Sequence, residues 1–131
     1  MCQRQPTTLT ADESELAICV KNRAATANYI WNAHTKLGLK AGTREEALHA
    51  VDTYGPLDGL TADEALIIGF GRELLEAPKV SDTTVDAVRA RYGEKGLMEL
   101  TALMSVYMMN ASILRVVDHP VPSDARPLTP R

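Results

Sequence analysis

Two side chains that can exchange protons, Glu15 and His34, stand nineteen residues apart in this 131-residue chain. A carboxylate bonded to an imidazole orients the ring and shares its proton, which is the basis of general acid–base catalysis. The two residues meet only if the chain turns back near Ala24 and Ala25, in an antiparallel helix hairpin. If one helix continues instead, the two residues lie about 28 Å apart. The chain around Asn22 holds neither glycine nor proline, so both arrangements remain open.

The face of the predicted helix that carries His34 is apolar, which indicates that the ring is partly buried. The residues at spacings of three, four and seven are Ala27, Ile30, Trp31, Leu37 and Gly38. A histidine in this setting is either a core residue with one satisfied hydrogen bond or a proton carrier. Glu15 also has an ordinary alternative role, because a carboxylate in the first turn of a helix compensates the helix dipole.

Other signatures of catalysis are missing from the sequence. It contains no HExxH or similar metal spacing, no glycine-rich phosphate loop and no serine-hydrolase elbow. We therefore expect no metal site and no cofactor. Cys2 and Cys19 form neither a CxxC pair nor a disulfide framework, and we interpret Cys19 as a buried thiol.

Helix start signals divide the chain into the elements that must position these residues. Thr10–Glu13, Thr43–Glu46 and Thr61–Glu64 have the spacing of capping boxes, and Ser81–Asp82 marks a fourth start. No stretch shows the sustained alternation of a strand. The sequence thus predicts an all-α bundle of about six helices, near 11–22, 26–41, 44–53, 62–76, 82–92 and 96–117. We expect one domain over residues 9–118, with flexible arms at 1–8 and 119–131.

Composition limits the partners of the chain. A net charge of −3 with scattered basic residues argues against nucleic-acid binding, and the N-terminus lacks an apolar signal region, which favours a cytoplasmic location. The uncharged run 100–114 is shorter than the roughly twenty residues of a membrane span. The predicted helix 96–117 is apolar on nearly all sides, which favours a homo-oligomer, or else a central core helix in a monomer.

Several segments together resemble the carboxymuconolactone decarboxylase family, also called alkylhydroperoxidase D-like. Glu15–Ala17 and Tyr29–His34 are similar to its E-L opening and Y-E-W-x-x-H motif, and Ala41–Glu46 to its A-G-L-S-x-E-E segment. Leu60–Glu76 and Val80–Asp82 look like its next helix and V-S-D turn. The resemblance covers roughly residues 9–120. It implies an all-α fold, homo-oligomers such as trimers or hexamers, and a glutamate and histidine facing each other across a hairpin.

The functional positions of the family are compared with this chain one by one. Peroxidatic relatives have cysteines seven and four residues before the histidine, where this chain has Ala27 and Ile30, which argues against a thiol peroxidase. In the decarboxylase-like branch a glutamate stands at the position of Ile30. Glu15 and His34 match the proton-relay positions.

The resemblance therefore implies a lyase that decarboxylates a small lactone or carboxylic acid without a cofactor, or isomerises it, with His34 and Glu15 as catalytic residues. The alternative is a catalytically silent family member that binds a small ligand or serves in assembly. We expect substrate contacts from Trp31, Tyr29, Asn32, Ile30 and, as the nearest cation in sequence, Arg23.

Overall fold

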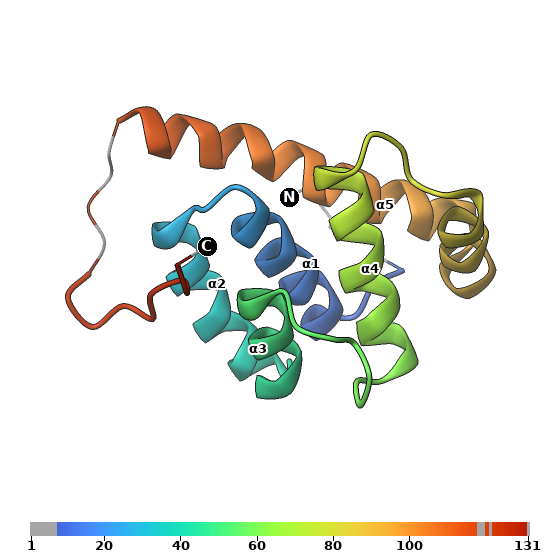
Figure 1. Cartoon of the computed structure of the whole chain (residues 1–131), viewed down its shortest axis with the longest axis horizontal. Helices are drawn as coiled ribbons and strands as arrows, with labels where there is room; N and C mark the ends of the chain where they lie inside the picture. Colours follow the sequence, from blue (N-terminus) through green and yellow to red (C-terminus); the bar gives the residue numbers. More distant parts are fainter. Residues whose placement is uncertain (1–7, 118–119, 121, 131) are drawn as a thin grey trace, which may run out of the picture.

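The computed structural model describes residues 8–117, 120 and 122–130. All regular structure in that part of the chain is helical, which confirms the all-α prediction. The helices are α1 (Ala11–Ala24), α2 (Asn28–Ala41), α3 (Glu45–Thr53), α4 (Ala62–Glu76) and α5 (Asp82–Val116). Helix α1 lies in the middle and packs against each of the other four, while α4 also packs against α5 (Figure 1). The helix that carries Glu15 is therefore the centre of the core.

The fifth and sixth helices expected from the sequence are the two parts of α5. They are separated at Gly93, whose backbone is not helical (φ 75°, ψ 178°). This conformation is open to glycine and strained for other residues. The direction of the chain changes there, so the first part stands apart from the long second part that crosses α1 (Figure 1). The two helices that the sequence indicates over 82–92 and 96–117 therefore follow one another as two parts of α5, with a kink at Gly93 between them.

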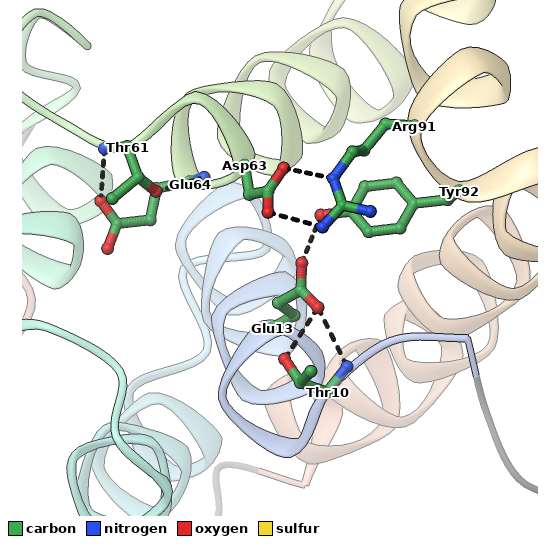
Figure 2. Close-up of polar contacts among 7 residues, drawn as sticks. All are labelled: Thr10, Glu13, Thr61, Asp63, Glu64, Arg91 and Tyr92. Atoms are coloured by element: carbon green, nitrogen blue, oxygen red, sulfur yellow. Dashed lines mark hydrogen bonds and ion pairs between the residues drawn. The ribbon is translucent and has the colours of Figure 1, made fainter.

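Two of the three predicted capping boxes are present. The hydroxyl of Thr61 accepts the backbone N–H of Glu64 at 3.1 Å, and the Glu64 carboxylate accepts the Thr61 N–H at 2.9 Å. Glu13 likewise accepts the N–H of Thr10 at 3.0 Å. Figure 2 shows that the other oxygen of Glu13 accepts the hydroxyl of Tyr92 on α5. Glu13 therefore caps α1 and also ties it to α5.

The third predicted box, at Thr43, is wrong. Helix α3 begins one residue later than expected, with Arg44 at its N-cap. Thr43 is buried, and its hydroxyl donates to the backbone carbonyl of Asp12 at 3.0 Å. Because this bond joins α3 to the first turn of α1, the tertiary contact has replaced the local cap.

Gly71 marks a close approach of three helices in the core. A Cβ atom at Gly71 would lie 2.4 Å from Cγ1 of Val20 on α1 and 2.9 Å from Cε of Met104 on α5. Gly69 lies in the same helix, but the nearest atom to a Cβ there is Cδ1 of Leu57 at 3.9 Å. The two glycines thus offer a matched test of how closely α1, α4 and α5 pack.

We expect Gly71→Ala to lower the free energy of unfolding by about 1–3 kcal/mol, because an overfilled core forces its neighbours to move. Gly69→Ala has room, and the better helix propensity of alanine should raise the free energy of unfolding by up to about 1 kcal/mol. Urea denaturation of both variants measures the difference. Equal stabilisation by the two substitutions would contradict the packing described above.

The exposed side of α5 is rich in large apolar side chains. Val106, Met109, Ile113 and Val116 are 56%, 62%, 54% and 86% exposed. By length and composition alone α5 could cross a membrane, but this is weak evidence, because core helices of soluble proteins meet the same criteria. The alternative of a central core helix in a monomer therefore does not hold for this side of α5 within the described chain.

The C-terminal segment turns at Ser123 and Asp124 and then returns alongside α2 and α3 (Figure 1). Its residues 122–130 make hydrogen bonds to α1, α2 and α3, which differs from the flexible arm that the sequence predicts. Thr8, in the other predicted arm, donates its N–H to Glu99 at 2.8 Å. The remaining positions of the two arms, 1–7, 119, 121 and 131, lie outside the described residues.

Candidate functional site

The turn between α1 and α2 brings the two proton-exchanging residues together. Helix α1 ends at Ala24 and α2 begins at Asn28. Thr26 adopts a left-handed backbone (φ 52°), which is uncommon for a β-branched residue, and the N–H of Ala27 donates to the carbonyl of Asn22 at 3.0 Å. Of the two arrangements that the sequence leaves open, the chain adopts the hairpin.

His34 and Glu15 form a hydrogen-bonded pair across this hairpin. Nδ1 of His34 lies 2.7 Å from Oε2 of Glu15, and the two side chains are 18% and 21% exposed. An ionised carboxylate can only accept, so Nδ1 carries the proton of this bond. The partner at Nδ1 fixes the ring orientation and leaves Nε2 as the nitrogen that can exchange a proton with a substrate.

Tyr107 of α5 contacts this pair from a third helix. Its ring meets the ring of His34 edge-on, with centroids 6.2 Å apart and an interplanar angle of 83°. The same tyrosine ring lies 5.4 Å from Nζ of Lys21, which also donates to the Tyr107 backbone carbonyl at 3.2 Å. Tyr107 therefore links the Glu15–His34 pair to a buried lysine.

Lys21 is the functional candidate that the sequence analysis missed. Its side chain is fully buried, and among the described residues no carboxylate lies within ion-pair distance of Nζ. Burial lowers the pKa of the amine from 10.5 to about 8. Uncompensated buried charges are costly and gather at functional sites. The one signal in the sequence was a lysine directly after the apolar run from Leu16 to Val20.

Two further polar groups of α1 are buried close to the hairpin. Cys19 is fully buried, and burial raises the pKa of its thiol to about 12. Within the described chain, neither Oδ1 nor Nδ2 of Asn22 has a hydrogen-bond partner, although the side chain is fully buried. Glu15, Cys19 and Asn22 are spaced by four and three residues, so they share one face of α1. This face of α1 therefore carries buried polar atoms, those of the Asn22 amide, that make no hydrogen bond within the described chain.

The four predicted substrate-contact residues of α2 differ in how far they are exposed. Trp31 is fully buried, and its Nε1 has no partner in the described part of the chain. Ile30 is 8% exposed, and Asn32 is buried with Oδ1 accepting the N–H of Arg126 at 3.0 Å. Tyr29 is 38% exposed. These four side chains do not line one open hollow.

The contacts of Arg23, the predicted anion contact, lie on the α3 side of α1. Its Nη2 donates to the carbonyl of Thr129 at 2.7 Å, and its guanidinium lies 5.2 Å from the ring centroid of Tyr54. Lys21, rather than Arg23, is the cation that shares a neighbour with the Glu15–His34 pair.

Two hollows in the surface are lined by residues other than Glu15 and His34. One of about 340 Å³ is lined mainly by apolar side chains and includes Ser14 of α1 and Val106 of α5. A larger one, of about 780 Å³, lies beside α3 and includes His49. No group of three metal-ligating side chains occurs among the residues that the structure describes.

In comparisons with known proteins, the chain matches no family model, no curated protein sequence and no solved structure.

Proposed function

We propose that this protein is a cofactor-free lyase resembling carboxymuconolactone decarboxylase, which decarboxylates a small lactone or carboxylic acid. The observation that supports this most is the 2.7 Å hydrogen bond between Nδ1 of His34 and Oε2 of Glu15 across a helix hairpin. The family resemblance implies this pairing, and the two residues are too far apart in sequence for it to be a local contact. Isomerisation or ring opening could use the same groups.

The proposed reaction uses His34 as a proton donor. The bond to the departing CO₂ breaks, its electron pair moves into the conjugated carbonyl of the substrate, and the carbon then takes a proton from Nε2. Glu15 holds the ring in place and stabilises its charged form before the transfer. Lys21 offers positive charge to the enolate oxygen that develops as CO₂ leaves. A proton from water returns His34 to its starting state.

The test is a mass-detected screen of small lactone acids and β,γ-unsaturated acids with wild-type protein and the His34→Ala variant. We expect loss of CO₂ from one substrate class with the wild-type protein only. Turnover at the same rate in both proteins would show that the pair is not the catalytic group.

A second candidate function is a non-catalytic ligand binder or assembly subunit of the same fold. It is favoured by Ile30, which is buried at the position where relatives with activity carry glutamate or cysteine. A binder would keep its affinity for the ligand in the His34→Ala variant and would show no product. A thiol peroxidase is disfavoured because burial raises the pKa of Cys19 to about 12, so little thiolate forms. Cys2 lies outside the described residues.

The proposal includes assembly into homo-oligomers, such as trimers or hexamers. Val106, Met109, Ile113 and Val116 follow one another at spacings of three, four and three, and this regular spacing places them in one apolar stripe on α5. Each of them is more than half exposed. A stripe of this kind is typical of a helix that packs against a second helix.

We expect Met109→Glu to reduce the oligomer to a smaller species at micromolar concentration, because it places a charge in the centre of the stripe. Light scattering coupled to size exclusion measures the mass, and circular dichroism checks that the helices remain. Lys36→Gln, which lowers the net charge by the same one unit at an exposed position of α2, is the control. An unchanged mass in both variants would place the interface elsewhere.

A further inference from the structure

After a turn at Ser123 and Asp124, residues 126–130 lie on a surface that matches an extended chain. The N–H of Arg126 donates to Oδ1 of Asn32 at 3.0 Å, and the N–H of Leu128 donates to Oδ1 of Asn28 at 3.3 Å. Two residues of extended chain span about 6.6 Å, and four residues of helix rise about 6 Å. The two asparagines are therefore spaced to accept alternate amides of an extended segment. Both asparagines lie on one face of α2. The segment runs antiparallel to this helix, because the earlier Arg126 bonds to Asn32 and the later Leu128 bonds to Asn28.

The sequence of the segment suits this geometry. Proline occupies positions 127 and 130 of this stretch, so those residues have no N–H to satisfy and their φ angles are already set for an extended chain. The amides of Arg126, Leu128 and Thr129 each donate to a side chain of the folded domain. The segment thus loses little conformational freedom when it docks.

Thr129 fits between two buried charged residues. Its N–H and its hydroxyl donate to the two carboxylate oxygens of Asp52 on α3, both at 2.8 Å. Its carbonyl accepts Nη2 of Arg23 on α1 at 2.7 Å. Arg23 and Asp52 are only 3% and 8% exposed. All three polar groups of one threonine are therefore recognised, and the hydroxyl distinguishes it from valine of the same shape.

The docked segment also covers part of the core. The Arg126 guanidinium lies 5.9 Å from the ring centroid of Trp31, and Leu128 packs against the main hydrophobic core. Because Trp31 is the only tryptophan of the chain and is fully buried, its fluorescence reports on whether the segment is in place.

We propose that α1, α2 and α3 form a peptide-docking surface that selects an extended segment with threonine at the Arg23–Asp52 position. Its occupant is the chain's own C-terminal segment, bound within the same molecule. This inference does not depend on the chemistry of the Glu15–His34 pair.

The test uses full-length protein carrying Thr129→Val, and acrylamide quenching of Trp31 fluorescence is measured. Valine keeps the shape but loses the hydroxyl bond to Asp52, so we expect the quenching constant to rise, whereas Thr129→Ser should quench like the wild type. Asp124→Ala is the matched control, because its ion pair with Lys36 is exposed and longer, at 3.4 Å. Circular dichroism verifies that the helix content is unchanged in each variant.

A synthetic peptide of residues 122–130 should bind to the Thr129→Val protein and restore the protection of Trp31. A peptide with valine in place of threonine should bind at least about tenfold more weakly, since it lacks a hydrogen bond to a charged group. Equal quenching in Thr129→Val and wild type, or equal binding of the two peptides, would overturn the proposal. Protection that depends on protein concentration would overturn binding within one molecule, because the segment would then come from a second copy.

Discussion

Replacement of His34 by alanine should lower kcat for the proposed decarboxylation by about 10²- to 10⁴-fold, which is the usual contribution of a positioned general acid. The substitution removes the ring nitrogen that bonds to Glu15. It should leave the fold intact, because the side chain is at the surface edge of the hairpin and 18% exposed. Measurement of kcat and KM separately shows whether proton transfer or binding is lost.

The Glu15→Gln variant tests whether Glu15 acts by orienting the His34 ring or by its negative charge. Glutamine can still accept a hydrogen bond from Nδ1 through its amide oxygen, but it does not stabilise a charged imidazole. We therefore expect a smaller loss in kcat than for His34→Ala, with little change in KM. His49→Ala is the control, since His49 is exposed on α3 and lines the hollow beside that helix. An equal loss of activity in the His49 and His34 variants would contradict the assignment of the pair.

The helices were predictable from local signals, whereas their junctions were not. The starts at Thr10, Thr61 and Ser81 follow from side chains that satisfy the N–H groups of the first turn. The turn at Thr26 carries no such signal, because its left-handed backbone is imposed by the packing of α2 on α1. Thr43 shows the opposite case, in which a correct local signal is overridden by a bond to another helix.

The site was predictable in part for a similar reason. The pairing of Glu15 with His34 could be anticipated because a hairpin makes their positions level. The neighbours from distant segments could not: Tyr107 and Lys21 meet only through the packing of α5 on α1. The C-terminal segment was expected to be free because it is rich in proline. Its docking depends on Asp52, a residue that looks like an ordinary surface carboxylate in the sequence.

The other large effect concerns Lys21, a fully buried amine with no carboxylate at ion-pair distance among the described residues. Replacement of Lys21 by methionine should raise the free energy of unfolding at pH 7 by about 1–3 kcal/mol, since an apolar side chain of similar length has no charge to desolvate. The same variant should lose activity if Lys21 stabilises the developing enolate. More stability with less activity is the pattern expected for a residue that is kept for function.

The pH dependence gives this prediction a clear sign. Burial lowers the pKa of Lys21 from 10.5 to about 8, so between these values the unfolded chain binds more protons than the folded one. The cost of burying the charge is therefore complete below pH 8 and is relieved as the pH rises toward 10.5. The stability advantage of Lys21→Met should shrink over the same interval.

Urea denaturation of wild type and Lys21→Met at several pH values between 7 and 10.5 measures this difference directly. Tyr92, whose pKa is raised by burial, acts in the opposite direction, but it is present in both proteins and its effect cancels. The pKa of Cys19 is raised by burial and lowered by the charge of Lys21, so both proteins also carry Cys19→Ala. Lys36→Met is the control, because Lys36 is 56% exposed and its loss should change stability by less than about 0.5 kcal/mol. A Lys21→Met protein that is less stable than wild type at pH 7 would mean that the bond from Nζ to the Tyr107 carbonyl outweighs the cost of the buried charge. Lys21 would then be a structural residue of the α1–α5 contact rather than part of the site.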